Sequence, residues 1–445
     1  MDTLDPTPPE PLPTAGLPAE AQAEAPAGAQ ADVPAERISF ISPPLWAVVA
    51  FLVSRMIMLT TGWGVISRIG VRAIGKGMYD HKHGLWHGFV PDRLADPWAN
   101  WDGQWFIRIA SDGYHLVHSE AFFPLYPFII RYVRYVTGNY VLAGTLVSWV
   151  AIALTLWLLY RMVAARFDAP VAAWTVAFLS FFPTSFYLTS VYSESLFLLF
   201  SVAAFYFAER KHWALAGVAG MLSVLTRNTG LFLVIPLALL MVEQEQAKGW
   251  REWARAVVRP RTLWLLLLPL GMGIYMAYLQ WKFGQPLLFA DAQRHWGRKL
   301  SSPFSAVGYA TYIAVRAVGR VASASTSLWA SPLRPGSVTN RIMQRTVVPW
   351  VTLVAWAAVA IAAIRKLPLS YTAWSLVLLI YPLFFPAGKT PLLSYQRFVL
   401  VAFPLFIAVA VLTRRHNITR FVLLAASAVL LVWLAATFAL WWWVA

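Results

Sequence analysis

The chain of 445 residues contains no cysteine, and only 13% of its residues are charged. The absence of thiols excludes disulfides, cysteine nucleophiles and thiolate metal sites. So few charges cannot cover the surface of a soluble protein of this length. The chain also lacks GxSxG, HExxH and Walker motifs, so its chemistry cannot be assigned from a short hydrolase or nucleotide-binding signature.

Long apolar runs take the place of charge. Hydrophobic residues make up 59% of the chain, and its mean hydropathy is +0.59. Apolar runs of ~18 residues or more are typical of membrane-spanning helices. We therefore expect an all-α polytopic membrane protein over residues 43–445, with about eleven transmembrane helices. The expected spans lie near 45–66, 139–160, 170–188, 194–208, 213–225, 229–242, 263–281, 346–364, 368–385, 397–413 and 418–444.

Residues 1–42 differ from the rest of the chain. They are rich in proline, alanine and glutamate, and they carry seven acidic residues and one basic residue. Such a segment cannot bury enough apolar surface to fold, so a disordered tail is expected. Its acidic start also does not fit a secretory signal. We place this tail in the cytoplasm of a multi-pass plasma-membrane protein.

The positions of the basic residues predict the topology. With the tail inside, every short inner loop is basic, as the positive-inside rule requires. These loops carry Arg161, Arg166, Arg210, Lys211, Lys248, Arg251, Arg255, Arg259, Arg261, Arg365, Lys366, Arg414 and Arg415. The net charge of +16 is thus explained by topology and membrane lipids, and no nucleic-acid partner is expected.

The same topology places two long segments outside, about 67–138 and 282–345, together with turns near 184–193, 226–229 and 386–396. The unusual polar residues gather in these segments. A transporter is expected to keep such residues near the middle of its spans. Charges concentrated on one face favour an extracytoplasmic active site instead.

Asp102 is the first candidate for chemistry. It precedes a short amphipathic stretch in which Trp105, Phe106 and Ile109 are apolar and Arg108 is polar. An aspartate before a helix is commonly an N-cap, and position alone favours that role. The cap does not exclude a catalytic role, so both interpretations stay open.

Further polar residues interrupt apolar sequence in the outer turns. Glu194 follows a run of hydroxyl residues, where it is either a helix-start carboxylate or a substrate ligand. Arg227 and Asn228 break a long apolar stretch, so Arg227 needs a partner, either Glu194 or an anionic ligand. Cations near the second long segment suit a lipid phosphate or a general headgroup patch. They are Arg294, Arg298, Lys299, Lys389 and Arg397.

The motifs resemble those of a known family. Trp101-Asp102, Ile107-Arg108-Ile-Ala, Asp112-Gly113-Tyr114 and Ala121-Phe-Phe-Pro124 resemble the PIG-V-like family, as do Tyr192-Ser-Glu-Ser195, Thr226-Arg227-Asn228-Thr-Gly230 and Ala292-Gln293-Arg294-His-Trp296-Gly-Arg298. The resemblance runs from about residue 98 to 298, and the later motifs resemble the bacterial branch of the family. Eukaryotic members of the family add the second mannose to the GPI anchor. The high alanine, arginine and tryptophan content is typical of a bacterium, so that acceptor is not carried over.

The resemblance implies a GT-C glycosyltransferase fold with a long first outer loop that carries a catalytic aspartate. It implies a polyprenyl-phosphate mannose donor and an acceptor that is a lipid or a glycan. Asp102 takes the position of the loop aspartate. Many GT-C relatives have two adjacent acidic residues there, whereas Gly103 follows Asp102, so a second carboxylate would come from elsewhere, such as Asp112 or Glu120. The expected donor-binding residues are Trp101, Glu194, Arg227, Asn228, Gln293, Arg294, Arg298 and Arg397.

Three alternatives remain at this stage. The transferred sugar could be arabinose, glucose or galactose, or the protein could be a lipid-linked sugar flippase or a structural assembly protein. We expect no cofactor. A divalent metal would need oxygen ligands from Asp102, Asp112, Glu120 and Glu194, and a metal-independent inverting reaction is favoured over it.

Overall fold

The structure is a computed structural model that describes residues 45–69, 96–322 and 337–444. Within these ranges every named element is helical, and one isolated bridge joins Arg298 to Ala387. Five stretches are long and apolar enough to cross a membrane: Val48–Arg68, Tyr140–Arg166, Pro260–Phe283, Thr339–Ala363 and Asn417–Ala439. The predicted class, an all-helical multi-pass membrane protein, is therefore confirmed. The predicted tail, residues 1–42, lies outside the described residues.

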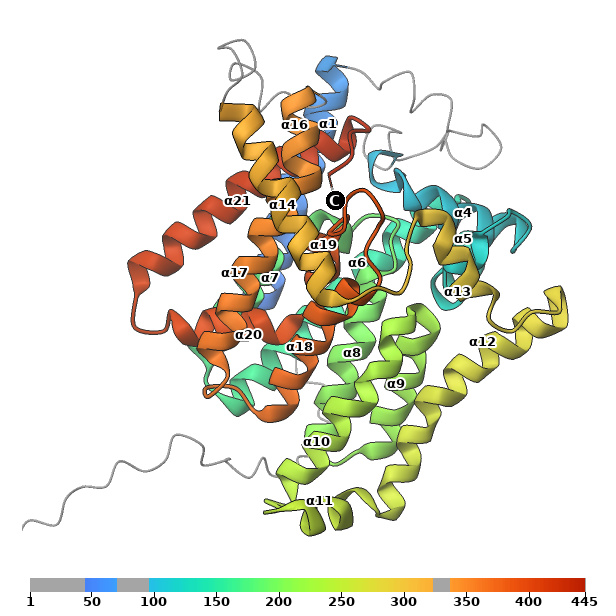
Figure 1. Cartoon of the computed structure of the whole chain (residues 1–445), viewed down its shortest axis with the longest axis vertical. Helices are drawn as coiled ribbons and strands as arrows, with labels where there is room; N and C mark the ends of the chain where they lie inside the picture. The colour runs from blue at the N-terminus through green and yellow to red at the C-terminus, as the bar shows by residue number, and fades with distance from the viewer. Residues whose placement is uncertain (1–44, 70–95, 323–336, 445) are drawn as a thin grey trace, which may run out of the picture. The chain divides into compact units, whose positions relative to one another are not determined.

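The long helices are α1 (Leu45–Ile69), α6 (Tyr140–Arg166), α12 (Leu267–Phe283, after η5, Pro260–Leu266), α17 (Val348–Ala363, after α16, Val338–Ile342, and η7, Met343–Val347) and α21 (Asn417–Ala439). The shorter apolar helices are α7 (Ala169–Ser180), α8 (Glu194–Glu209), α9 (Trp213–Thr226), α10 (Val234–Gln244, after η4, Asn228–Leu233), α18 (Leu369–Phe384) and α20 (Phe403–Leu412). Every predicted span overlaps one of these helices (Figure 1). The number of helices that cross the membrane stays a prediction.

Side-chain caps define where two of these helices begin. The Asn139 side chain accepts hydrogen bonds from the backbone N–H groups of Val141 (2.7 Å) and Leu142 (3.1 Å) at the start of α6. Asp168 accepts from Val171 N–H at 2.7 Å at the start of α7. These caps satisfy N–H groups that have no acceptor within the helix. The chain therefore turns sharply from α6 into α7, and the two helices pack together.

Three predicted spans are shorter than expected; the last, expected over 418–444, ends at Ala439. The span expected over 170–188 ends at Ser180, and η3 (Ser185–Leu188) follows it. Pro183 lies just beyond, where a proline disfavours continuation of the helix. The span expected over 397–413 begins at Phe403, and residues 395–399 form the separate helix α19 (Tyr395–Val399). Arg397 is therefore on a short helix next to the span.

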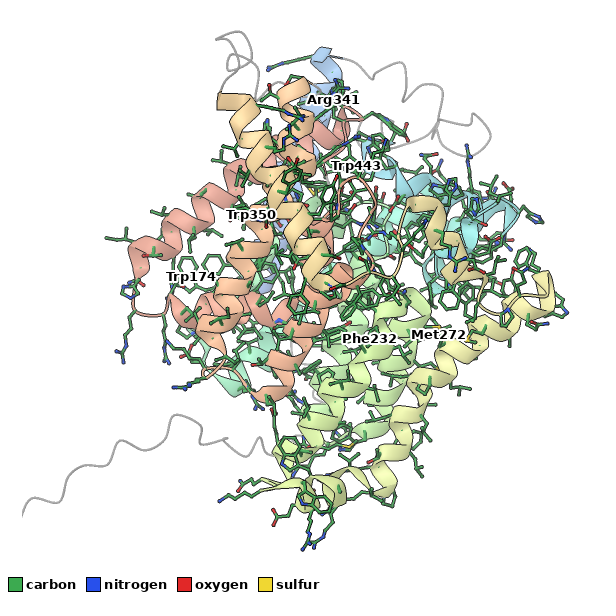
Figure 2. All side chains as sticks on the ribbon, in the orientation of Figure 1. Trp174, Phe232, Met272, Arg341, Trp350 and Trp443 are labelled. Atoms are coloured by element: carbon green, nitrogen blue, oxygen red, sulfur yellow. The ribbon has the colours of Figure 1, made fainter. Side chains whose placement is uncertain are left out.

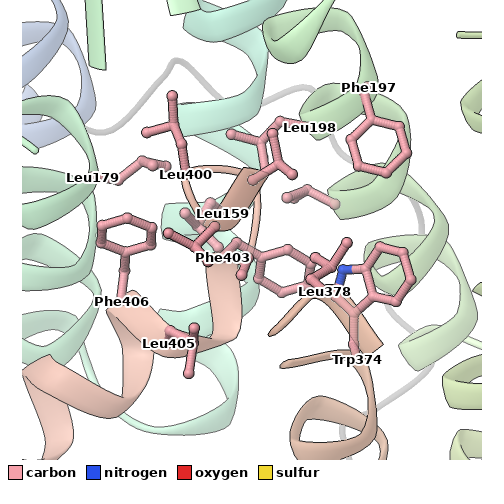
Figure 3. Close-up of a cluster of buried hydrophobic side chains, with 14 of the residues drawn as sticks. Leu159, Leu179, Phe197, Leu198, Trp374, Leu378, Leu400, Phe403, Leu405 and Phe406 are labelled. Atoms are coloured by element: carbon pink, nitrogen blue, oxygen red, sulfur yellow. The ribbon is translucent and has the colours of Figure 1, made fainter. Parts of the chain in front are cut away.

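The core lies where the shorter helices meet (Figure 3). Leu159 of α6, Leu179 of α7, Phe197 of α8 and Phe403 of α20 are all fully buried there. In a lipid environment such contacts stabilise helix association through close packing rather than through exclusion of water. The core therefore forms a rigid support beneath the polar turns.

Small residues bring α9 close to its neighbours. A Cβ atom on Gly217 would lie 2.3 Å from the Trp264 carbonyl oxygen of η5, and one on Gly220 would lie 2.6 Å from the Leu268 side chain of α12. Only glycine allows backbones to approach this closely, as in other membrane helix pairs. The position of η5 relative to α9 thus depends on Gly217.

The two predicted outer segments contain helices of their own. The first contributes η1 (Asp96–Ala99), α4 (Asp102–Asp112), η2 (Ser119–Ala121) and α5 (Leu125–Thr137). The second contributes α13 (Leu288–Gln293), η6 (Arg294–Trp296) and α14 (Pro303–Ala322). The short helix α11 (Trp250–Val257) packs against α10, at the end of the helices away from α4 and α13 (Figure 1).

Candidate active site

A cavity of about 780 Å³ lies between α4, α13, α18 and α19. Aromatic and aliphatic side chains form much of its wall, among them Phe122, Phe289 and Phe398. Charged residues line it as well: Asp102, Arg227, Asp291, Arg294, Arg298, Lys299 and Arg397. An apolar cavity with a few convergent charged groups is typical of a ligand-binding site.

The two outer segments pack against each other beside this cavity. Trp296 of η6 lies 5.5 Å from Trp105 and 5.8 Å from Phe122, measured between ring centroids. The imidazole rings of His118 and His295 stack at 4.1 Å. Aromatic pairs at these distances contribute about 0.5–1.5 kcal/mol each beyond their buried area. Segments almost 200 residues apart in sequence thereby build one wall.

Asp102 is the first residue of α4, and its carboxylate points to Arg397. Its Oδ2 atom accepts a hydrogen bond from Arg397 Nη1 at 2.5 Å. Trp101 occupies the N-cap position, and no side chain caps this helix. The N-cap interpretation of Asp102 is therefore wrong, because the α4 amides are left without a side-chain acceptor while the carboxylate forms an ion pair.

The backbone around Asp102 is held from two sides. Tyr192 Oη accepts a hydrogen bond from the Asp102 N–H at 3.2 Å and donates one to the Asn100 carbonyl at 2.8 Å. The backbone of Trp101 has a φ of 56°, a conformation that residues other than glycine rarely adopt. The Trp101 indole packs against Trp441 and Trp443. Such strain costs about 1–3 kcal/mol and persists where the surroundings enforce it. The position of Asp102 is thus firmly determined.

Glu194 lies behind this ion pair. Its Oε1 atom accepts hydrogen bonds from Arg397 Nε and from Arg227 Nη1, the latter at 2.6 Å. The Glu194 side chain is fully buried, and its Oε2 atom has no protein partner. Of the two partners expected for Arg227, the structure provides Glu194. Asp102 and Glu194 therefore balance the charges of Arg227 and Arg397.

Arg298 has a different environment. Its guanidinium donates to the carbonyl oxygens of Phe385 (3.0 Å) and Leu393 (3.2 Å) and lies over the Phe398 ring. No carboxylate among the described residues pairs with it. Burial and, secondarily, the nearby Arg397 cation lower the pKa of Arg298 to about 10. The side chain remains charged at neutral pH, so the cavity holds a cation that a bound anion would stabilise.

The other expected donor-binding residues differ in whether they line the cavity and in how exposed they are. Gln293 lines the cavity and donates to the Ala121 carbonyl at 3.5 Å. Asn228 lines it as well and donates to Tyr381 Oη at 2.8 Å. Arg294 has a side chain that is 72% exposed and pairs with Asp291 at 3.4 Å. Trp101 does not line the cavity, but it supports Trp443, which does.

The two carboxylates suggested as partners for Asp102 lie elsewhere. Asp112 is exposed at the opposite end of α4, about 15 Å along the helix from Asp102. Glu120 is buried in η2, where Tyr275 donates to its backbone carbonyl, and it does not line the cavity. The second carboxylate near Asp102 is Glu194, which reaches the site through Arg397. Among the described residues no three histidine or acidic side chains form a cluster that could hold a metal.

Three cavity residues did not stand out in the sequence. Tyr381 lies within the apolar helix α18 and Phe398 directly after Arg397 at the start of an expected span, where an aromatic side chain is usual. Trp443, labelled in Figure 2, comes from the segment after α21 and lines the cavity. In the sequence, only the run of three tryptophans at 441–443 could have drawn attention to Trp443.

The fold and the cavity define a multi-pass helical membrane protein with a charged pocket beside the two packed segments that were predicted to lie outside. Residues 84–235 match the family described as Mannosyltransferase (PIG-V). This part of the chain is similar to that family, which confirms the resemblance recognised in the sequence, while the bacterial branch stays a prediction.

Curated relatives support the same assignment. The chain is 30% identical over 139 residues to GPI mannosyltransferase 2 of Schizosaccharomyces pombe, a match that covers 30% of each chain. It is 29% identical over 123 residues to GPI mannosyltransferase 2 of Drosophila melanogaster, covering 25% of this chain and 27% of the relative. The chain thus spans less than a third of the length of these relatives.

Solved structures show similarity over more of the chain. The crystal structure of ArnT from Cupriavidus metallidurans bound to undecaprenyl phosphate has a TM-score of 0.48 and 12% identity, covering 89% of this chain and 76% of ArnT. The Archaeoglobus fulgidus oligosaccharyltransferase has a TM-score of 0.45 and 12% identity, covering 90% of this chain and 56% of that protein.

Proposed function

We propose that the protein is a GT-C-type mannosyltransferase that moves a mannosyl residue from a polyprenyl-phosphate donor to a lipid or glycan acceptor. The observation that carries this proposal is that one cavity contains a carboxylate, Asp102, and a guanidinium, Arg298, whose hydrogen bonds within the described residues go to backbone carbonyls rather than to a carboxylate. These are the two groups that sugar transfer from a lipid phosphate requires: one takes a proton and one stabilises the leaving phosphate. The family match over residues 84–235 includes Asp102, Glu194 and Arg227.

In the proposed reaction Asp102 takes the proton of the acceptor hydroxyl as that oxygen bonds to the anomeric carbon. The bond between the anomeric carbon and the phosphate oxygen breaks, and its electron pair leaves with the lipid phosphate. In-line attack converts a β-linked donor into an α-linked product. Proton transfer of this kind contributes about 10²–10⁴-fold to the rate.

The departing phosphate becomes a dianion, and stabilising such developing charge is usually the largest catalytic term. Arg298 is the best placed cation, since no carboxylate among the described residues forms an ion pair with it, and the exposed Lys299 is adjacent. Arg397 has a positioning role: it holds Asp102 by Oδ2, while Oδ1 has no partner among the described residues and can accept the proton.

The proposed location is the extracytoplasmic face of the plasma membrane. It rests on the basic inner loops and on the packing of the two long segments around the cavity. On that face the acceptor is an envelope lipid or glycan.

The test is transfer of radiolabelled mannose from polyprenyl-phosphate mannose in membranes that contain the protein. Asp102→Asn should reduce transfer by about 10²–10⁴-fold, because the amide cannot accept the proton. Asp112→Asn is the matched control: it changes an exposed carboxylate at the other end of α4 and should leave transfer unchanged.

A folded Asp102→Asn protein with wild-type turnover would remove Asp102 as the base. If the folded wild type transfers no mannose, the donor sugar is wrong, and other polyprenyl-phosphate sugars are tested next. Movement of a lipid-linked sugar across the bilayer without any transfer product would instead identify a flippase.

A further inference from the structure

Asn228 and Tyr381 form a hydrogen-bonded pair in the wall of the cavity that contains Asp102, one from η4 and the other from α18. The Asn228 side-chain nitrogen donates to Tyr381 Oη at 2.8 Å, and both residues line the cavity. Each residue is only partly buried, so part of its surface borders the cavity. The steps assigned to Asp102 and Arg298 use neither side chain.

The pair keeps hydrogen-bonding capacity that the protein does not use. The Tyr381 hydroxyl accepts the bond from Asn228, and it donates its own hydrogen to no group among the described residues. The Asn228 side-chain oxygen likewise accepts no bond from the part of the chain that the structure describes. This oxygen is accessible, unlike the buried unpaired Oε2 atom of Glu194. The pair therefore offers an O–H donor and a C=O acceptor close together.

The surroundings hold both side chains in place. The Tyr381 ring lies 5.2 Å from Phe232 and 5.3 Å from Phe385, measured between ring centroids. Asn228 begins η4, which packs so closely on α9 that a Cβ atom on Gly230 would lie 2.6 Å from backbone atoms of that helix. Side chains fixed in this way can select a ligand by geometry.

A donor beside an acceptor suits a sugar better than a phosphate. A sugar hydroxyl can both donate and accept, whereas an ionised phosphate oxygen only accepts and would be repelled by the Asn228 oxygen. A clamp between η4 and α18 would use the same bond, since polar side chains often join membrane helices. A clamp alone, however, needs no free donor or acceptor on a cavity wall.

The pair also lies near the cation assigned to the donor phosphate. Arg298 donates to the Phe385 carbonyl at 3.0 Å, and Phe385 follows Tyr381 by about one helical turn, or about 6 Å along α18. The transferred sugar is bonded directly to that phosphate. A donor phosphate held by Arg298 therefore brings its sugar, rather than its lipid chain alone, within reach of Tyr381.

We propose that Asn228 and Tyr381 bind hydroxyl groups of the transferred sugar and thereby select it. This inference rests on the proposed function, because the sugar is the one carried by the polyprenyl-phosphate donor. Apolar side chains such as Leu378 and Phe398 also line the cavity. In such surroundings a sugar that lacks the hydroxyl leaves the pair without its bonds, and a site of this kind discriminates strongly. Tyr381 is then a specificity-determining residue for the reaction.

The experiment compares polyprenyl-phosphate mannose with donors that lack one hydroxyl of the mannose, each position in turn. Initial rates at low donor concentration, which report kcat/KM, are measured in membranes that contain the full-length protein. Tyr381→Phe keeps the ring and removes only its hydroxyl, and Asn228→Ala tests the other member of the pair. Tyr395→Phe is the matched control, because that hydroxyl bonds the Leu379 carbonyl of α18 at 3.0 Å and does not line the cavity.

We expect the wild type to use at least one deoxy donor about tenfold to 100-fold less efficiently than the mannose donor. In Tyr381→Phe this penalty should shrink to less than about threefold, because the partner of the missing hydroxyl is already gone. Asn228→Ala should reduce the same penalty or that of a neighbouring hydroxyl. Tyr395→Phe should keep the wild-type ratios, and comparing variants cancels the intrinsic reactivity of each donor.

Unchanged ratios for every deoxy donor in both Tyr381→Phe and Asn228→Ala would overturn the inference while mannosyl transfer by the wild type upheld the proposed function. A lower apparent Tm together with unchanged ratios would identify the pair as a clamp. If the folded wild type transfers no mannose at all, the proposed function fails and this inference falls with it.

Discussion

Arg397 contacts two carboxylates with different nitrogen atoms: Nη1 for Asp102, which lines the cavity, and Nε for Glu194, which lies behind it. A guanidinium can do this because its donors form a rigid planar fork, whereas a lysine ammonium acts as one point charge. Asp102 is therefore oriented from Glu194 through Arg397. Glu194, fully buried and absent from the cavity wall, is better described as a positioning residue than as a substrate ligand.

The substitution Arg397→Lys tests whether Arg397 orients the Asp102 carboxylate. It keeps the positive charge but cannot hold both carboxylates, so Asp102 should lose its orientation. We expect kcat for mannosyl transfer to fall by about tenfold or more, with little change in the donor KM. Steady-state kinetics with purified protein measure both constants. A rise in KM at constant kcat would show that Arg397 binds the donor directly.

Arg298→Gln should change both constants. The donor phosphate loses a cation before and during its departure, so KM should rise by about tenfold or more and kcat should also fall. Arg294→Gln provides the comparison, because that side chain is 72% exposed and already paired with Asp291, and it should change KM by less than about threefold. Equal effects of the two substitutions would point to a diffuse headgroup patch in place of a defined phosphate site.

The sequence could identify individual polar residues but not their pairings. Glu194 and Arg227 were recognisable because each interrupts apolar sequence, where an unpaired charge is costly. Asp102 was recognisable because it precedes a short amphipathic stretch and matches a family motif. The ion pair between Asp102 and Arg397 joins residues 295 positions apart, and no local pattern encodes it. The same limit explains why Asp112 and Glu120 were considered as neighbours of Asp102. They are close in sequence, yet α4 and η2 carry them away from the site.

At the scale of elements, hydrophobic runs predicted where helices occur but not where some of them end. The separation of α19 from α20 depends on a turn at Ala402 before Pro404, within an apolar stretch that looks continuous. The helix α14 lies in a segment expected only as a long loop. Arg316 and Arg320 interrupt its apolar sequence, so it lacks the long run that identifies a span, and its existence was hidden.

The approach of η5 to α9 gives a prediction about stability. Gly217→Ala would place a methyl group 2.3 Å from the Trp264 carbonyl oxygen, and a backbone atom cannot easily move away. We expect a loss of about 1–3 kcal/mol in stability, seen as a lower apparent Tm in detergent. Gly273→Ala in α12 is the control, since nothing lies within 4 Å of its new methyl group. An unchanged Tm in Gly217→Ala would mean that η5 is not held closely against α9.

At the scale of the whole molecule, the absence of cysteine makes the predicted orientation directly testable. Lys299→Cys, beside the cavity, should react with a membrane-impermeant maleimide in intact cells. Arg251→Cys, on α11, should react only after the membrane is permeabilised. This pattern follows from basic inner loops and an outer cavity. Labelling of Arg251→Cys alone in intact cells would invert the proposed orientation.

The short helices also determine the depth at which chemistry takes place. The helices α7, α9 and α20 have 12, 14 and 10 residues, so they rise about 15–21 Å, whereas the hydrocarbon core of a bilayer is about 30 Å thick. We therefore expect the end of α9 that carries Arg227 to lie below the headgroup plane, with the cavity recessed into the leaflet. A lipid carrier could then deliver its sugar by lateral diffusion while its chain stays in the hydrocarbon core. A water-soluble acceptor would have to enter the leaflet to reach the site.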